Sequence, residues 1–264
     1  MTWTWAKALT LGSAAGLLSG LFGVGGGVLL VPAMVIALGV TQRRAHATSL
    51  AAVLPISLAS GATYVVAGLF DPWAAAALIV GALPAVFLGT FLLERLPQRI
   101  LRVLFAGLMI LTAARLFLPL TNVGSTFEPT VLPLLALVAT GFMVGVLSSL
   151  LGVGGGVFVV PMLILVFSLD PVLARGTSLI MIIPVAVLAT WRSRRSGNIE
   201  GRLAVVLGIS GMAFAVLGAR LAVILNVRVS AILFATFLAI VGVQLIVAGA
   251  RKDAAQAREK VSIR

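Results

Sequence analysis

The chain contains no cysteine, a single histidine and only seven acidic residues among its 264 residues. The absence of cysteine excludes disulfides, thiolate catalysis and Cys-ligated metal sites. Charged residues make up 10% of the sequence, against about 25% in soluble domains. Hydrophobic residues make up 61%, and nearly every stretch between charged clusters reaches the ~20 apolar residues that a spanning helix needs. We therefore expect an all-α polytopic membrane protein with almost no soluble part.

Ionisable side chains are scarce within the expected membrane spans. No Asp, Glu or Lys lies in the middle of a span, and His46 stands beside Arg43 and Arg44 in an expected solvated loop, residues 42–46. Intramembrane proteolysis or metal chemistry would need a Ser–His pair or acidic and histidine ligands inside the bundle. The sequence therefore predicts no catalytic residue, metal site or cofactor.

The strongly basic balance has a membrane explanation. The net charge is +12, from 19 Lys and Arg against seven Asp and Glu. These basic residues fall in short loops and near the C-terminus, as the positive-inside rule expects, so we predict the bilayer and not nucleic acid as the partner. Lys7 with the following apolar run imitates a signal peptide. The same pattern recurs at 137–151, inside the chain, where no signal peptide can lie. We therefore expect the N-terminal run to be a membrane segment and not a signal peptide.

A glycine-rich stretch occurs twice in the chain. Gly23-Val24-Gly25-Gly26-Gly27 returns 129 residues later as Gly152-Val153-Gly154-Gly155-Gly156. Each glycine inside a helix costs about 1 kcal/mol relative to Ala, so each copy predicts a helix break. Residues 12–55 align without gaps to residues 141–184 with 18 identities in 44 positions. This indicates a duplication: a first repeat at 1–122, a linker at 123–130, a second repeat at 131–250 and a basic cytoplasmic tail at 251–264.

Each repeat is expected to hold one Gly-broken segment and three transmembrane helices. The segments are 9–40, 47–69, 74–93 and 100–118, then 131–169, 176–191, 203–224 and 229–250. If the broken segments are re-entrant, most basic residues and both termini share one side, which the positive-inside rule makes cytoplasmic. The repeats then form an inverted-topology pair. Each arm of about 13 residues is long for half a bilayer, so a fully spanning, discontinuous helix stays open.

Small residues recur every four positions before each break. Gly12, Gly16 and Gly20 precede the first break, and Gly141, Gly145 and Ser149 precede the second. Such faces are typical of close helix–helix packing in membranes.

The duplicated motifs are similar to those of a known family. GVGGGVLLVP is followed by AHATSL, and GVGGGVFVVP is followed by ARGTSL. Over about residues 8–250 the chain resembles the TauE/SafE sulfite exporter family. The resemblance implies secondary transport of small sulfur oxyanions or organosulfonates, such as sulfite or sulfoacetate, across the bacterial inner membrane.

The glycine breaks themselves suit an anion. Under the inverted model, the two tips meet near the midplane, where helix N-termini offer free N–H groups and about half a positive charge each. Matched Gly-interrupted segments are a pointer to a transporter's binding site. We therefore expect the anion to contact Gly25, Gly26, Gly27 and Val28; Gly154, Gly155, Gly156 and Val157; Ser19, Ser148 and Ser149; and Thr48, Ser49, Thr177 and Ser178.

Each of these assignments has a structural alternative. The glycines could form a packing turn, the serines before the breaks could serve packing, and the Thr-Ser pairs could be N-caps. Pro55 and Pro184 fall mid-span, where they would kink the helix, and we assign them a gating or shaping role. Arg175 lies at an expected outer mouth, where it is either an anion attractor or an ordinary surface charge.

Three functional alternatives remain open from the sequence. The protein could be an exporter that works by alternating access, an anion channel of the same architecture, or a proton- or Na⁺-coupled anion importer. The protein could also form a homodimer.

Overall fold

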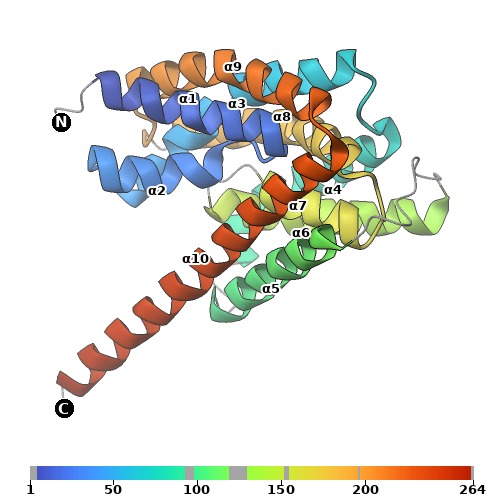
Figure 1. Ribbon diagram of the computed structural model, residues 1–264. Helices are drawn as coiled ribbons and strands as arrows, with labels where there is room; N and C mark the ends of the chain where they lie inside the picture. The colour runs from blue at the N-terminus through green and yellow to red at the C-terminus, as the bar shows by residue number, and fades with distance from the viewer. Residues whose placement is uncertain (1–4, 93–97, 119–129, 152–154, 196, 263–264) are drawn as a thin grey trace.

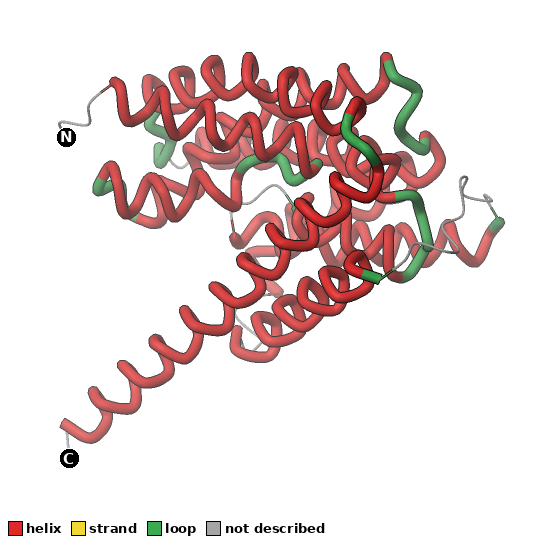
Figure 2. The backbone as a smooth tube through the Cα atoms, viewed as in Figure 1, coloured by secondary structure: helices red, strands yellow, loops and turns green. Residues whose placement is uncertain are grey.

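The computed structural model describes residues 5–92, 98–118, 130–151, 155–195 and 197–262. This part of the chain folds into ten α-helices joined by short loops (Figures 1 and 2). The helices of the first half are α1 (Trp5–Phe22), α2 (Gly27–Leu38), α3 (Gln42–Val66), α4 (Pro72–Leu92) and α5 (Gln98–Phe117). Those of the second half are α6 (Val131–Leu151), α7 (Gly156–Leu165), α8 (Pro171–Arg195), α9 (Gly201–Ile224) and α10 (Val227–Ser262). The expected all-helical class is confirmed.

Three of the described helices, α3, α8 and α9, are long and apolar enough to cross a membrane. Shorter apolar stretches, of 10–17 described residues, lie in α2, α4, α5, α6, α7 and α10. The described chain therefore offers several candidate spans.

The expected loop at residues 42–46 is wrong. Residues 42–46 do not form a loop: they are the first turn of α3, and His46 is half-buried there. The charged segment after residue 250 is helical and extends α10 to Ser262, where Figure 1 shows it projecting from the bundle. In both places the apolar pattern ends at charged residues, but the helix continues through them, because Arg, Lys, Gln and Glu are good helix formers.

Helix starts in the two halves keep one offset. The helices α2, α3, α4 and α5 begin at residues 27, 42, 72 and 98, and α7, α8, α9 and α10 begin 129 residues later in each case. Each broken segment therefore supplies one long helix and one short one, followed by three further helices.

Contacts between helices fix their relative directions. Gly12 of α1 lies against Leu207 of α9 and Gly20 against Ala215, so α1 and α9 are parallel. Helix α3 runs the same way, because Thr48 bonds to Glu200 at the start of α9. We call the side on which α1, α3 and α9 begin the Arg44 side.

Helices α4, α6 and α8 run in the opposite direction, since Gly176 near the start of α8 lies against Tyr64 near the end of α3. Gly141 of α6 lies against Leu78 of α4 and Gly145 against Ala82, which makes α4 and α6 parallel. Arg192, near the end of α8, donates a hydrogen bond to the Val86 carbonyl of α4, so α8 shares this direction. The helix that precedes the first glycine break and the helix that precedes the second are therefore oppositely oriented.

The first broken segment is a hairpin. Since α1 and α3 both begin on the Arg44 side, α2 must return to that side between them, and Figure 1 shows it turning back beside α1. Helix α1 has 18 residues and is about 27 Å long, whereas α2 has 12 and is about 18 Å long. The segment thus enters and leaves on one side but penetrates deeply.

The expected small-residue faces pack helix against helix. A Cβ on Gly16 would lie 1.9 Å from the Gly211 carbonyl oxygen of α9, and one on Gly141 would lie 2.2 Å from the Leu78 carbonyl oxygen of α4. Only glycine permits these backbones to approach so closely. The interpretation of these faces as packing surfaces is confirmed for the glycines; the side chain of Ser149 lies outside the described part.

Candidate functional site

The site begins with two helix breaks that only glycine can form. Helix α1 ends at Phe22 and α2 begins at Gly27, and between them Gly26 adopts a left-handed conformation with φ 76°. Gly155 takes the same role before α7, with φ 82°. Residues with a Cβ rarely adopt this conformation, so these positions favour glycine on backbone grounds alone.

The two breaks meet inside the protein. A Cβ on Gly156 would lie 2.8 Å from the Gly23 carbonyl oxygen and 2.9 Å from the Val24 carbonyl carbon. All three residues that form this contact are buried in the described chain. The glycines therefore bring segments separated by more than a hundred residues to a single place.

This meeting point lies halfway along the two central helices. A Cβ on Gly25 would lie 3.1 Å from Ile182 of α8 and 3.4 Å from Val53 of α3. Both side chains are fully buried, and each stands at the twelfth position of a 25-residue helix. The breaks thus lie at mid-depth, between equivalent positions of α3 and α8.

Both short helices present unused amide groups at this point. The N-cap residues of α2 and α7 are Gly26 and Gly155, and neither supplies a side-chain hydrogen bond to the first amides of its helix. Within the described residues, the N–H groups of Gly27, Val28, Gly156 and Val157 donate to no protein acceptor. The first N–H groups of a helix carry its positive dipole end, so the two N-termini form a place suited to negative charge.

Two serine hydroxyls stand beside the breaks without partners. Ser19 and Ser148 are fully buried, and neither hydroxyl has a hydrogen-bond partner in the described chain. The Ser148 Oγ would lie 3.5 Å from a Cβ on Gly155. An unsatisfied buried hydroxyl costs about 1–3 kcal/mol, so its occurrence at matching positions in both halves suggests an acceptor brought by a ligand.

The four Thr-Ser hydroxyls are instead engaged within the protein. Thr48 accepts from the Glu200 amide at 3.0 Å and Thr177 from the Asp71 amide at 2.9 Å. These amides directly precede α9 and α4, so the threonines hold the starts of neighbouring helices and do not cap their own. The serines donate to carbonyls: Ser49 to His46 at 2.9 Å and Ser178 to Gly23 at 3.0 Å. These bonds favour structural roles.

Arg175 is fully buried near the start of α8, so the alternative that it is an ordinary surface charge is wrong, and its role as an anion attractor stays a prediction. Its guanidinium donates to the Leu21 carbonyl at 3.2 Å, the Ser230 carbonyl at 3.1 Å and the Ser230 hydroxyl. It also lies 5.0 Å from the ring centroid of Phe234. In the sequence, four apolar residues lie between Arg175 and the nearest charged residue. The tight packing of the Arg175 backbone against Gly23 could not be predicted, because the two residues are far apart in the chain.

Arg175 therefore brings a positive charge close to the first break, and the Asp170 carboxylate acts on that charge only from beyond ion-pair distance. Within the described chain no carboxylate lies in ion-pair distance of its guanidinium, and its Nε has no partner. Burying a charge without a counterion is costly unless hydrogen bonds or a ligand offset the loss of solvation.

Pro55 and Pro184 lie inside α3 and α8, as expected from the sequence. Pro55 packs against Gly208 of α9. Gly154 is outside the described residues, so its predicted contact with the anion is not placed by the structure.

Two contributors were missed by the sequence reasoning. Tyr64, fully buried at the end of α3, donates to the Gly20 carbonyl of α1 at 2.9 Å and so holds α1 just before its break. Ser230 anchors Arg175 from α10. Tyr64 could have been identified from the sequence, because it is the only tyrosine in so apolar a chain. No local sequence feature distinguishes Ser230.

Comparison with known proteins is consistent with this architecture. The family model described as "Sulfite exporter TauE/SafE" matches residues 1–116 and 137–264. A "Probable membrane transporter protein YunE" of Bacillus subtilis is 27% identical over 264 residues, covering 91% of this chain and 97% of the relative. A "Probable membrane transporter protein" of Haemophilus influenzae is 30% identical over 162 residues, covering 59% of this chain and 61% of the relative. No solved structure matches significantly.

These matches, together with the helical architecture, identify a multi-pass membrane transporter and not an enzyme. The chain belongs to the TauE/SafE sulfite exporter family.

Proposed function

We propose that the protein is a secondary transporter that exports a small sulfur-containing oxyanion, such as sulfite, sulfoacetate or a related organosulfonate. The observation that carries the proposal is the buried meeting point of α2 and α7. Amides of Gly27, Val28, Gly156 and Val157 that have no acceptor among the described residues occur there beside the hydroxyls of Ser19 and Ser148, which likewise have no partner in that part of the chain. The family description supplies the sulfur chemistry.

The electrostatics of the meeting point favour a monovalent anion. Two helix N-termini contribute about half a positive charge each, enough together to balance one negative charge. Sulfonate and sulfite oxygens accept several hydrogen bonds, which matches a site built from N–H and O–H donors. Arg175, buried beside Gly23 without a carboxylate partner in the described chain, adds positive potential from one side.

Two inverted repeats would provide alternating access. Support comes from the common offset of the helix starts, from the matching Thr48–Glu200 and Thr177–Asp71 bonds, and from the opposite directions of α1 and α6. In such transporters the two repeats rock around a fixed site at mid-depth. Pro55 and Pro184, equivalent kink positions in α3 and α8, are the proposed places where the central helices bend.

We place the Arg44 side in the cytoplasm. Lys7, Arg43, Arg44 and Arg194 all belong to helix ends on that side, and the positive-inside rule assigns such a side to the cytoplasm. Helix α10 begins on the opposite side, where Ser230 meets Arg175, and returns. Both termini are then cytoplasmic, and the membrane is the bacterial inner membrane.

The membrane potential gives the proposed direction. A potential that is negative inside supplies about 2.3 kcal/mol per charge per 100 mV, roughly a 40-fold concentration ratio, to an anion moving outward. Within the described spans no carboxylate is placed to bind a proton or Na⁺ at mid-depth, so an electrogenic uniport of the anion requires the fewest additional groups.

The test is flux from proteoliposomes. A potassium–valinomycin potential that is negative on the cytoplasmic side should accelerate movement of sulfite away from that side, and the flux should saturate and show counterflow. Flux that ignores the potential but collapses with a proton or Na⁺ gradient would contradict uniport export. Flux that does not saturate would indicate a channel.

A further inference from the structure

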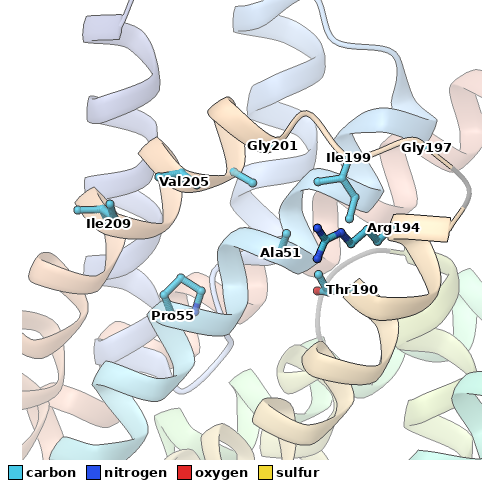
Figure 3. A pocket seen from close by; sticks show the side chains of 10 residues that line it. Ala51, Pro55, Thr190, Arg194, Gly197, Ile199, Gly201, Val205 and Ile209 are labelled. Atoms are coloured by element: carbon cyan, nitrogen blue, oxygen red, sulfur yellow. The ribbon is translucent and has the colours of Figure 1, made fainter.

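A cavity lies away from the glycine breaks. It has a volume of about 580 Å³ and is walled by α3, α8, α9 and the loop before α9 (Figure 3). We call it the α3–α8–α9 groove and define it by Pro55, Thr190, Arg194, Gly201, Val205 and Ile209. Its volume is in the range of clefts that bury a ligand of a few tens of atoms.

Helix α3 separates this groove from the proposed transport site. Val53 points to Gly25 of the first break. Pro55, two residues later, lies about 200° further around the helix and lines the groove. The groove therefore faces the other side of α3, so it is a separate site and not a vestibule that opens onto the breaks.

One end of the groove is suited to an anionic group. Arg194 is exposed, and its side chain has no hydrogen-bond partner among the described residues; Figure 3 shows it extending into the cavity. The Thr190 hydroxyl, on the same wall, is buried and has no hydrogen-bond partner in the described part of the chain. Helix α9 begins here at Gly201, and the nearby Glu200 carboxylate is already paired with Arg44 at 2.7 Å. Cationic, hydroxyl and helix N-terminal donors thus converge, and none of the described residues that line the groove carries a competing carboxylate.

The other end of the groove is apolar and faces outward. Val205 and Ile209 lie one turn apart on α9 and are 58% and 61% exposed. Helix α9 is one of the three described helices able to span a membrane, so an exposed apolar side chain in its span contacts the bilayer. From Gly201 to Ile209 the groove extends about 12 Å along the helix, from polar donors to hydrocarbon.

From this gradient we propose that the α3–α8–α9 groove binds an anionic phospholipid of the leaflet on the Arg44 side. Its phosphate lies against Arg194, Thr190 and the start of α9, and an acyl chain runs along Val205 and Ile209. A free phosphate or oxyanion would use only the polar end. A zwitterionic lipid would bring its own cation to Arg194 and gain less, since basic residues near the surface select anionic lipids.

The proposal is tested by lipid binding to the purified full-length protein in detergent. Native mass spectrometry counts bound lipid, and thermal unfolding reports stabilisation, because a ligand that binds only the folded state raises apparent stability. The probes are phosphatidylglycerol, phosphatidylcholine with the same acyl chains, and glycerol phosphate. Arg194→Gln and Val205→Trp alter the two ends of the groove. Arg202→Gln is the control for charge: it removes an exposed positive charge of α9 that does not line the groove.

The expected result is one tightly bound phosphatidylglycerol, stabilisation that exceeds that by phosphatidylcholine, and no comparable effect of glycerol phosphate. Arg194→Gln should weaken binding roughly fivefold, corresponding to about 1 kcal/mol per basic residue. Val205→Trp should also reduce bound lipid, and Arg202→Gln should leave it unchanged.

Equal effects of the two lipids, or full retention of binding in both groove variants, would overturn the proposal. Stabilisation by glycerol phosphate alone would show that the site takes free anions and not lipid. Because transport is not the readout, failure here leaves the proposed export function unaffected.

Discussion

At the residue scale, the most informative side chains are the two serines without partners. Ser19 and Ser148 keep buried hydroxyls that nothing in the described chain satisfies. In a purely structural position such a group is unfavourable, because burying an unpaired hydroxyl costs free energy. The anion that we propose as substrate would supply the missing acceptors.

We therefore predict that Ser148→Ala raises the stability of the anion-free protein by about 1 kcal/mol, since it removes an unsatisfied buried hydroxyl. Thermal unfolding in detergent measures the effect. Ser60→Ala is the matched control: Ser60 is equally buried, but its hydroxyl already donates to the Ile56 carbonyl at 2.9 Å. A loss of stability in Ser148→Ala that exceeds the loss in Ser60→Ala would show that Ser148 has a protein partner.

Arg175 gives a second prediction at this scale. Its two terminal nitrogens reach the Leu21 carbonyl and both oxygens of Ser230, a geometry that a single ammonium cannot reproduce. Arg175→Lys should lower the unfolding free energy by about 1–3 kcal/mol, because buried acceptors lose their donors.

Arg228→Lys is the control for Arg175. Arg228 also bridges two carbonyls, those of Phe117 and Leu118 at 2.8 Å, but it is solvent-exposed. Exposed groups regain water, so its replacement should shift the unfolding temperature much less. Equal shifts of the unfolding temperature in Arg175→Lys and Arg228→Lys would mean that the burial of Arg175 adds nothing to the stability of the protein.

At the element scale, close packing of α1 on α9 sets the position of the first break. A Cβ on Gly16 would lie 1.9 Å from a backbone carbonyl oxygen of α9, and no side-chain rotation relieves such a contact. Gly16→Ala should therefore separate the helices and lower the unfolding temperature strongly.

Gly107→Ala makes the matched comparison. Gly107 lies within α5, and apart from its own helix backbone no described atom lies within 4 Å of the position its Cβ would take. There alanine should stabilise the helix by about 0.5–1 kcal/mol. If Gly16→Ala and Gly107→Ala change the unfolding temperature in the same direction, the packing account of α1 is wrong.

The helices and breaks were largely predictable from the sequence, because apolar runs, glycine clusters and prolines are local signals. The breaks between Phe22 and Gly27 and before Gly156 fall where the glycines placed them. Charged helix starts, as at Arg43, were missed, because polarity alone does not separate a loop from an exposed helical turn. Burial of Arg175 depends on contacts between α8, α1 and α10, which are distant in sequence and leave no local pattern.

At the scale of the whole molecule, the direction of α2 decides the topology. The chain has no cysteine, so single introduced cysteines report accessibility cleanly. In right-side-out cells, Lys7→Cys and Arg43→Cys should react only with permeant reagents, whereas Ala67→Cys should react with impermeant ones. All three positions are exposed in the structure. Labelling of Lys7→Cys and Arg43→Cys from opposite sides would make the broken segment a crossing and not a hairpin.

The central claim is that both glycine breaks together form one anion site, and titration calorimetry with sulfite tests it most directly. The account predicts one sulfite bound per chain, with Ser19→Ala and Ser148→Ala each weakening affinity by roughly 10- to 100-fold, the loss of about 1.5–3 kcal/mol for a hydrogen bond to a charged group. Ser60→Ala should bind as the unaltered protein does. Two sulfites per chain, or unchanged affinity when either serine beside a break is replaced, would contradict a single site shared by the two halves.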